Sequence, residues 1–423
     1  MLNVINSSEG VRIIGLQTND YKTNQIIISM ALPLDDDTAA NALTLYLLRR
    51  SCKKYPDFSL LNSKLDSLYG ASLGCNVSKI GDAQVLSLSI TYIDDRFALY
   101  GESISSECIE LLSDIIFNPN VTRKSFGKEN LDNEKRLMIE RIEDEFDDKR
   151  TYAFNKCIEK LCYNDVFAKN KLGTTEEVKA LRMPDIYAAW KRILSTAVFQ
   201  ITSVGSADSE EISNVFTEKF QNIERNVCQL KTSFLTKSHR SARSEEIQPV
   251  NQGKLVLGFR TGMHNEEDRK YEHIVMNDIF GGGTYSKLFT VIREKMSLAY
   301  YCWSRLIVSK GLLMVEAGID TDKEKQTTAG IINQLNEVRS GNISPETLDN
   351  SKKSLKENYT FSSPSSFAAW YDSQICSNRV IEPDEAIKEV EKVTVESIKE
   401  CAKQLALGSV FMLSSDENAE DAV

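Results

Sequence analysis

The side chains that could bind a metal or activate a nucleophile are few and far apart. Only three histidines occur, His239, His264 and His273. On a helix, the spacing of His264 and His273 puts them on opposite faces, because successive residues turn by about 100°. No G-x-S-x-G motif occurs, and no histidine is placed to activate a serine or cysteine. The histidines therefore predict neither a zinc site nor a hydrolase nucleophile.

Cysteine usage and charge bound the broad class of protein. The nine cysteines are scattered and include no C-x-x-C pair, which favours reduced, mostly buried thiols in a cytoplasmic protein over a disulfide framework. The net charge of −10 argues against general binding to nucleic acid or to an anionic membrane. No secretory signal is visible, and no apolar run approaches the roughly 20 residues of a membrane helix. We expect a cytoplasmic protein with neither a nucleic-acid nor a membrane partner.

The strands and helices that the sequence predicts follow the same order twice along the chain, and any site must be built on them. Residues 25–32 form a β-rich run, residues 39–50 and 59–68 have the pattern of helices, and residues 85–92 alternate as a half-buried strand. A closing strand is expected at residues 198–204.

The second half repeats this order with weak identity. A strand at 255–259 precedes helices at 271–280 and 286–294, and a strand at 312–319 follows. Residues 410–413 give the closing strand. The recurrence indicates two copies of one α+β unit.

The repeat predicts an α+β fold of two homologous halves, each a mainly antiparallel sheet with helices packed on one face. The expected boundaries are residues 1–230, a polar linker at 231–246, and residues 247–423. A doubly wound parallel sheet is the alternative, but no G-x-G-x-x-G or G-K-[ST] motif follows a strand.

One segment of the second half carries a specific resemblance. Residues 280–289 read Phe-Gly-Gly-Gly-Thr-Tyr-Ser-Lys-Leu-Phe, and residues 292–300 read Ile-Arg-Glu-Lys-Met-Ser-Leu-Ala-Tyr. This combination resembles the C-terminal-half signature of the pitrilysin/insulinase family, inverzincins that include the mitochondrial processing peptidases. The likeness extends over nearly the whole chain. It is closest to short bacterial members that lack the metal, some of them associated with the aminopentanol modification of elongation factor P.

The resemblance implies that the family's zinc site is lost here. The family holds zinc with H-x-x-E-H on a helix and a distal glutamate, because residues i and i+4 share one helix face. The three motif positions fall on Ala42, Leu45 and Tyr46, and the distal acid on Asp132. We therefore expect no catalytic residue, no metal and no cofactor in this chain.

Arg293 and Tyr300 are the positions at which the family signature survives. In relatives, an arginine and a tyrosine at this spacing hold the substrate backbone and steady the developing oxyanion, so the resemblance implies a substrate-binding role. The alternative is that Arg293 pairs with Glu294 and Tyr300 belongs to the core.

Three functional hypotheses remain open. The first is an inactive zinc-peptidase homologue that pairs with an active zinc-bearing homologue, or with itself, around a peptide-processing chamber. The second is a non-catalytic peptide- or protein-binding scaffold without associated proteolysis. The third is a hydrolase that uses unrecognised residues. The first implies a non-catalytic subunit of a metalloendopeptidase-like complex.

Overall fold

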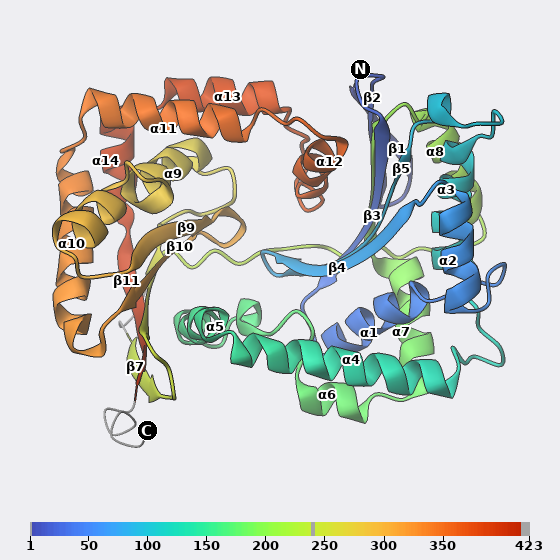
Figure 1. Ribbon diagram of the computed structural model, residues 1–423, viewed down its shortest axis with the longest axis horizontal. Helices are drawn as coiled ribbons and strands as arrows, with labels where there is room; N and C mark the ends of the chain where they lie inside the picture. Colours follow the sequence, from blue (N-terminus) through green and yellow to red (C-terminus); the bar gives the residue numbers. More distant parts are fainter. Residues whose placement is uncertain (1, 238–241, 416–423) are drawn as a thin grey trace. The chain divides into compact units, whose positions relative to one another are not determined.

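The computed structural model describes residues 2–237 and 242–415, so His239 lies outside the described residues. Its contacts divide the chain into two compact units (Figure 1). Unit 1 consists of Met1–Ile142, Lys169–Lys231 and Phe361–Val380, and unit 2 consists of Glu143–Ala168, Thr232–Thr360 and Ile381–Val423.

Unit 1 is built on a six-stranded sheet in the order β1-β2-β6-β3-β5-β4. Neighbouring strands are antiparallel except β2 and β6, which run parallel. β3 is buried along most of its length, as its Ile- and Met-rich sequence predicts for a central strand. The strands are β1 (Leu2–Ser8), β2 (Val11–Gln17), β3 (Thr23–Pro33), β4 (Ser72–Ile80), β5 (Ala83–Ile93) and β6 (Val198–Gly205).

Helices of the first half pack their apolar sides on one face of this sheet and form the large core of unit 1. α1 is buried on nearly every side, which explains why its sequence is apolar all round. These helices are α1 (Thr38–Leu48), α2 (Phe58–Ser67), α3 (Ile104–Phe117), α4 (Lys128–Asp147), α6 (Thr175–Ala180), α7 (Met183–Thr196) and α8 (Ser209–Phe220), with the short η1 (Asp95–Phe97).

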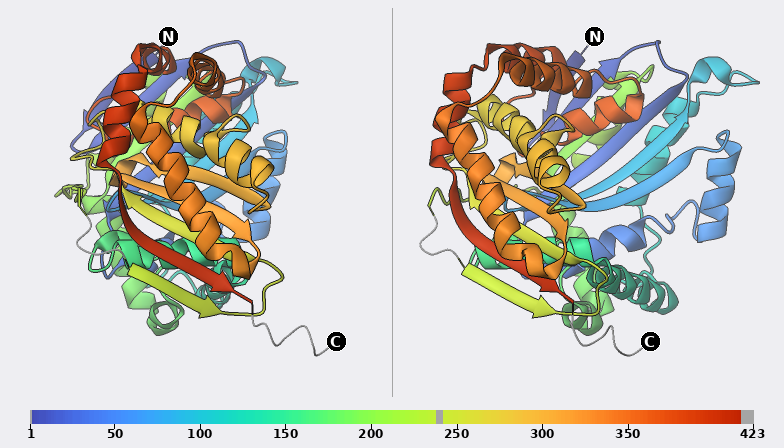
Figure 2. Two further views of the ribbon diagram at one scale, coloured as in Figure 1. Left: turned by 90° about the vertical axis from the view of Figure 1, so that its left-hand side faces the viewer. Right: turned by 60° about the vertical axis from the view of Figure 1, so that its left-hand side comes forward.

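Unit 2 is built on a five-stranded sheet in the order β7-β11-β8-β10-β9. β7 runs parallel to β11 and the other neighbours are antiparallel (Figure 2). This arrangement matches that of β2, β6, β3, β5 and β4, so the predicted repeat and the α+β fold class are confirmed. The strands are β7 (Ala242–Ile247), β8 (Gly253–Arg260), β9 (Tyr301–Ile307), β10 (Leu312–Ile319) and β11 (Ala406–Ser414).

The helices of the second half cover one face of the unit 2 sheet and enclose its main core. Two of them are π-helical, with wider turns than an α-helix. The elements are α9 (Lys270–Asn277), η3 (Asp278–Gly282), η4 (Leu288–Lys295), α10 (Glu324–Ser340), α11 (Pro345–Asn358), α13 (Pro383–Lys392) and α14 (Val395–Gln404), with the short η5 (Val308–Lys310) and η6 (Thr321–Lys323).

One helix from each half of the sequence packs on the sheet of the other half (Figure 1). α5 (Lys149–Leu161), followed by the short η2 (Val166–Ala168), lies against β8 and β11 and builds a separate apolar cluster there. α12 (Pro364–Asp372) lies against β3 and β6. Both units are therefore discontinuous in sequence. They differ in this from the predicted division into 1–230, 231–246 and 247–423, and β7 occupies the end of the predicted linker.

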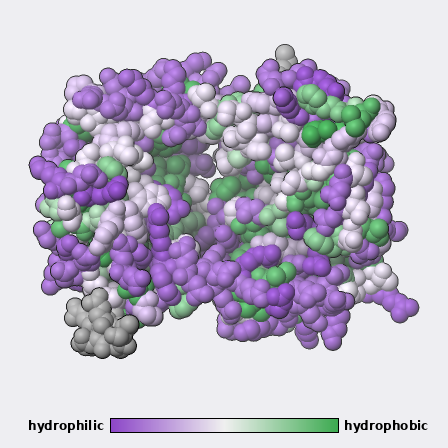
Figure 3. All heavy atoms as spheres, in the orientation of Figure 1, coloured by the Kyte–Doolittle hydropathy of each residue, from purple (hydrophilic) through white to green (hydrophobic). Residues whose placement is uncertain are grey.

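Hydrophilic residues predominate on the face of each unit that Figure 3 shows, with hydrophobic atoms scattered among them. Single exposed side chains such as Leu99 and Tyr100 account for part of the apolar surface. Throughout residues 2–237 and 242–415, every helix is too short or too polar to span a bilayer.

Candidate functional site

The predicted metal positions lie on α1 and offer no ligand set. Ala42 and Leu45 are 0% and 1% exposed and belong to the unit 1 core, whereas Tyr46 is half-buried at its edge. Asp132, the predicted remnant of the distal acid, is exposed on α4. Among the residues that the structure describes, no three His, Cys, Asp or Glu side chains are grouped so that they could hold a metal ion.

The acid that α4 directs towards α1 is Glu134 rather than Asp132. Glu134 is 5% exposed and accepts a hydrogen bond of 2.8 Å from Arg50 Nη1. Arg141 Nη1 lies 4.0 Å from the other carboxylate oxygen, and the Arg141 guanidinium stacks 4.2 Å from the centre of the Tyr46 ring. The sequence did contain this signal, since Glu134 falls in the buried helical stripe between Leu131 and Met138.

The two described histidines have other roles. His273 is buried, its Nδ1 lies 2.9 Å from the Arg269 carbonyl oxygen, and burial lowers the pKa of its imidazole. His264 Nδ1 lies 3.0 Å from an Asp268 carboxylate oxygen on the surface. His273 lies on α9, whereas His264 precedes the helix, so the opposite-face argument from their spacing does not apply to this pair.

Arg293 and Tyr300 come from the two sides of a sharp corner between η4 and β9. The last turn of η4 is wide, with Met296 N–H donating to the Val291 carbonyl. The chain then reverses through Ser297, whose φ of 51° lies in the left-handed region. A wide π-turn re-aims the side chains that follow it, and such turns are frequent at functional sites.

The corner brings the predicted pair together. A shallow pocket of ≈ 350 Å³ is lined by Arg293, Glu294, Ser297, Leu298, Ala299, Tyr300, Asp320 and Lys323. The Arg293 side chain is 43% exposed, stacks on the Phe289 ring at 4.6 Å and lies 3.5 Å from Glu294. Tyr300 is 62% exposed, so it is not the core residue of the alternative interpretation.

Tyr300 is held by an acid that the sequence analysis missed. Its hydroxyl donates a 3.0 Å hydrogen bond to Asp320, whose other oxygen accepts from Lys323 Nζ at 2.5 Å. The bond to Asp320 raises the pKa of the Tyr300 phenol, and the bond from Lys323 lowers the pKa of Asp320. The phenol is thus protonated, and in this arrangement it presents lone pairs, not its proton, to the pocket.

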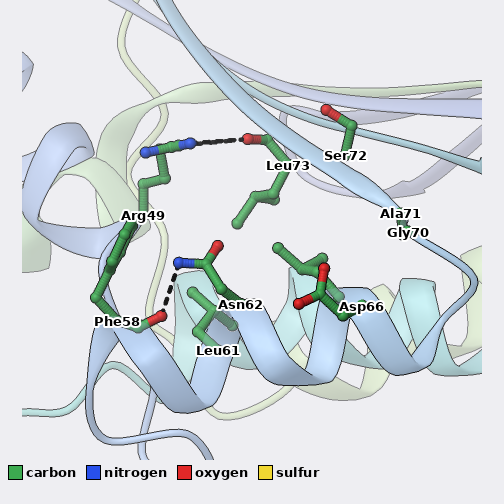
Figure 4. A pocket seen from close by; sticks show the side chains of 10 residues that line it. Arg49, Phe58, Leu61, Asn62, Asp66, Gly70, Ala71, Ser72 and Leu73 are labelled. Atoms are coloured by element: carbon green, nitrogen blue, oxygen red, sulfur yellow. Dashed lines mark hydrogen bonds between the residues drawn. The ribbon is translucent and has the colours of Figure 1, made fainter.

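The first half contains an equivalent corner between α2 and β4 (Figure 4). Ala71 N–H donates to Leu65 O just as Leu298 N–H donates to Ile292 O, both at 3.0 Å. This register makes Asp66 the counterpart of Arg293 and Leu73 the counterpart of Tyr300. The family's Arg and Tyr pair is therefore confined to the second half.

The pocket at this first corner measures ≈ 270 Å³. Arg49 enters it from the end of α1, but its guanidinium donates to the Leu73 carbonyl at 3.1 and 3.3 Å (Figure 4). Asn62 similarly donates to the Phe58 carbonyl at 2.9 Å. The side chains of Arg49 and Asn62 in this pocket are thus bonded to the protein's own backbone.

The close packing of η3 on β9 explains why residue 281, in the glycine-rich break before η4, is a glycine. A Cβ at this position would lie 2.6 Å from the backbone nitrogen of Ser304 on β9, a distance that side-chain carbons do not adopt. The glycine therefore allows η3 to approach β9 closely, which places η4 and Arg293 over the end of the strand.

Comparisons with known proteins agree with this description. Residues 181–355 match the family model "Peptidase M16 inactive domain". The chain is 27% identical to the "Probable inactive metalloprotease YmfF" of Bacillus subtilis, over 96% of both chains. It is 24% identical to the "Uncharacterized zinc protease YmxG" of the same organism, over 70% of this chain and 72% of that protein.

Solved structures share the fold over almost the full length. A conserved protein from Enterococcus faecalis has a TM-score of 0.88 at 25% identity, covering 98% of this chain and 99% of the other. A peptidase M16 inactive domain from Pseudomonas fluorescens has a TM-score of 0.79 at 15% identity, covering 98% of each chain. The chain thus resembles the M16 family, the pitrilysin and insulinase peptidases, as an inactive homologue that is not catalytic by itself.

Proposed function

We propose that this protein is the non-catalytic subunit of a peptide-processing complex in the cytoplasm, paired as a heterodimer with an active zinc-bearing homologue. In this complex it supplies Arg293 and Tyr300 to hold the substrate backbone, while the partner supplies the metal and the attacking water. The observation that carries the proposal is the pocket in which these two side chains meet.

The chemistry of that pocket suits an extended peptide. The guanidinium of Arg293 offers several N–H donors in a planar fork, which can bind the carbonyl oxygen of a peptide. The Tyr300 hydroxyl, with its proton engaged by Asp320, can accept a peptide N–H. Steadying an oxyanion would require the phenol to turn away from Asp320 and donate.

The first unit explains why a partner is needed. Where the family places two zinc-binding histidines and a general base, α1 carries Ala42, Leu45 and Tyr46. Alanine and leucine have no donor atom, so the α1 positions cannot reproduce the motif. A homologue with intact ligands would supply what is missing.

The relatives support such a division of labour. Bacillus subtilis contains both a protein named as a probable inactive metalloprotease and one named as a zinc protease, and this chain is similar to both. An inactive and a zinc-bearing member can thus occur in one cell.

The test is to purify the protein alone and together with the zinc-bearing homologue encoded in the same genome, and to assay peptide cleavage. We expect a stable complex that cleaves and an isolated chain that does not. In the complex, Arg293→Ala should lower kcat/KM by about 100-fold, the scale of losing one transition-state donor. Tyr300→Phe should lower it by a smaller factor.

Lys295→Ala is the matched control, because Lys295 is an exposed cation on the same helix that does not line the pocket. Its rate and its assembly should equal those of the unmodified complex. Equal rates for Arg293→Ala would refute the substrate role. Failure to form a complex, combined with peptide binding by the isolated chain, would favour a binding scaffold without proteolysis.

A further inference from the structure

The region near the predicted metal positions has acquired a positively charged cluster. It consists of Tyr46 in the last turn of α1, Arg50 just after this helix, and Glu134 and Arg141 from α4, and we call it the α1–α4 cluster. Glu134 lies between the two guanidinium groups, at 2.8 Å from Arg50 Nη1 and 4.0 Å from Arg141 Nη1. All four residues belong to unit 1.

The charges of the α1–α4 cluster do not balance. Two guanidinium groups face one carboxylate, and a third, Arg49, lies near enough to act with Arg141 on the neighbouring Cys75 thiol. Although burial raises the pKa of Cys75, these two arginines act in the opposite direction. A neutral thiol beside the arginines does not offset their positive charge.

Two guanidinium nitrogens of the cluster also lack acceptors. Arg50 Nε and Arg141 Nη1 are buried, and neither donates a hydrogen bond to any described residue. The distance of 4.0 Å between Arg141 Nη1 and Glu134 is too long for one. A buried donor without an acceptor is unfavourable, more so when it is charged.

The rest of the Arg141 side chain is available to a ligand. It is 41% exposed, and stacking on the Tyr46 ring fixes the plane of its guanidinium. A planar fork that is already oriented matches a carboxylate, which can accept two parallel N–H bonds.

We propose that the α1–α4 cluster is a carboxylate-binding site, which makes the protein selective for acidic peptides. The carboxylate comes from a glutamate or aspartate side chain or from a peptide C-terminus, which present the same two oxygens. The inference rests on the peptide binding of the proposed function, but not on the zinc-bearing partner.

The experiment measures binding of pentapeptides to the full-length protein by isothermal titration calorimetry, and the C-terminus of each peptide is capped except in the third. One alanine-based peptide carries a central glutamate and a second carries glutamine. A third has no acidic side chain but a free C-terminal carboxylate. We expect the glutamate peptide, or the free-carboxylate peptide, to bind about tenfold more tightly than the glutamine peptide, as one charge-assisted bidentate contact provides. Whichever of the two binds more tightly identifies the source of the carboxylate.

Arg141→Gln should abolish this preference, whereas Arg136→Gln should retain it. Arg136 is the matched control, an exposed arginine on the same helix that pairs with Glu140. If Arg141→Gln does not fold, Arg141→Lys tests the same point, because it keeps the charge but loses the fork and should weaken the preference. Equal binding of all three peptides to the unmodified protein, or a preference that survives both Arg141 variants, would overturn the proposal. The peptide-binding results do not depend on whether a complex forms or cleaves. The carboxylate site can therefore be refuted while the proposed function holds, and the reverse is also true.

Discussion

The α2–β4 corner of the first half and the η4–β9 corner of the second half share one backbone design and differ in chemistry. In both, an N–H after the corner donates to a carbonyl of the preceding helix, and a left-handed residue, Gly70 or Ser297, turns the chain. The second corner presents Arg293 and Tyr300 to solvent. The first presents Asp66 and the buried Leu73 in their place.

Under the proposed function, the difference separates stability at the first corner from peptide binding at the second. In the first half, charged groups near the corner are partly buried and bonded to the protein itself, as Arg49 and Glu134 are. In the second half, the charges around Tyr300 are exposed, and Asp320 and Lys323 pair mainly with each other. We therefore expect substitutions to affect folding at the first corner and ligand contacts at the second.

The largest expected effect is at Glu134. Glu134→Ala leaves the Arg50 and Arg141 guanidinium groups without their shared carboxylate, and should lower the free energy of unfolding by about 3 kcal/mol. Chemical denaturation followed by circular dichroism measures this change. Asp320→Asn, at the exposed second corner, should leave the unfolding midpoint unchanged. Equal destabilisation by both substitutions would remove the proposed contrast between the halves.

The helices α5 and α12, each of which packs on the sheet of the other half of the sequence, differ in the titratable group that they bury. Asp372, at the end of α12, is half-buried, and one of its carboxylate oxygens is buried without a partner among the described residues. Burial raises its pKa to about 6. On the sheet of unit 2, α5 instead buries Cys157, and burial raises the pKa of this thiol to about 12, so it stays neutral.

The docking of α12 should therefore depend on pH in a range where that of α5 does not. The folded-state pKa of Asp372 lies above the unfolded value of about 3.9, so the fold favours the protonated carboxyl. The stability that this group contributes is therefore complete below about pH 4 and is lost as the pH rises through about 6. Asp372→Asn should make the protein more stable than wild type by about 2 kcal/mol at pH 7, with the gain vanishing near pH 4. Denaturation curves across this range measure the difference, and the exposed Asp349→Asn is the control. A gain independent of pH would contradict the assignment.

A third, smaller effect concerns one glycine of each half, Gly281 in η3 and Gly70 in the α2–β4 corner. Gly281→Ala places a Cβ against the Ser304 backbone and should destabilise the fold by about 1.5 kcal/mol, since the packed elements must move apart. Gly70→Ala meets no atom within 4 Å but has a φ of 75°, and should cost about 1 kcal/mol of backbone strain. Only the first should also lower the cleavage rate of the proposed complex, because η4 carries Arg293. A rate loss with Gly70→Ala would place function at the first corner as well.

The sequence predicted the elements better than their assembly. Runs such as residues 25–32 and 312–319 became β3 and β10, because a short apolar or alternating pattern encodes burial on a sheet directly. The Arg293 and Tyr300 pair was found through a local motif and lies in one pocket. The exchange of α5 and α12 was not predicted, since an amphipathic pattern shows that a helix has a buried face but not which sheet buries it.

Asp320 was missed for a related reason. Its contact with Tyr300 joins residues that are adjacent across strands β9 and β10 but 20 apart in sequence. Pairing register, rather than residue pattern, creates this contact.

The smallest expected effect tests that contact directly. The hydrogen bond to Asp320 raises the pKa of Tyr300 because the charged acceptor favours the protonated phenol. Asp320→Asn should therefore lower the pKa of Tyr300 towards the ordinary value of about 10. Ultraviolet titration of each protein against its Tyr300→Phe counterpart isolates this one phenol. If the pKa does not change, Tyr300 does not donate to Asp320 in solution, and its proton is free to meet a substrate carbonyl without any rearrangement.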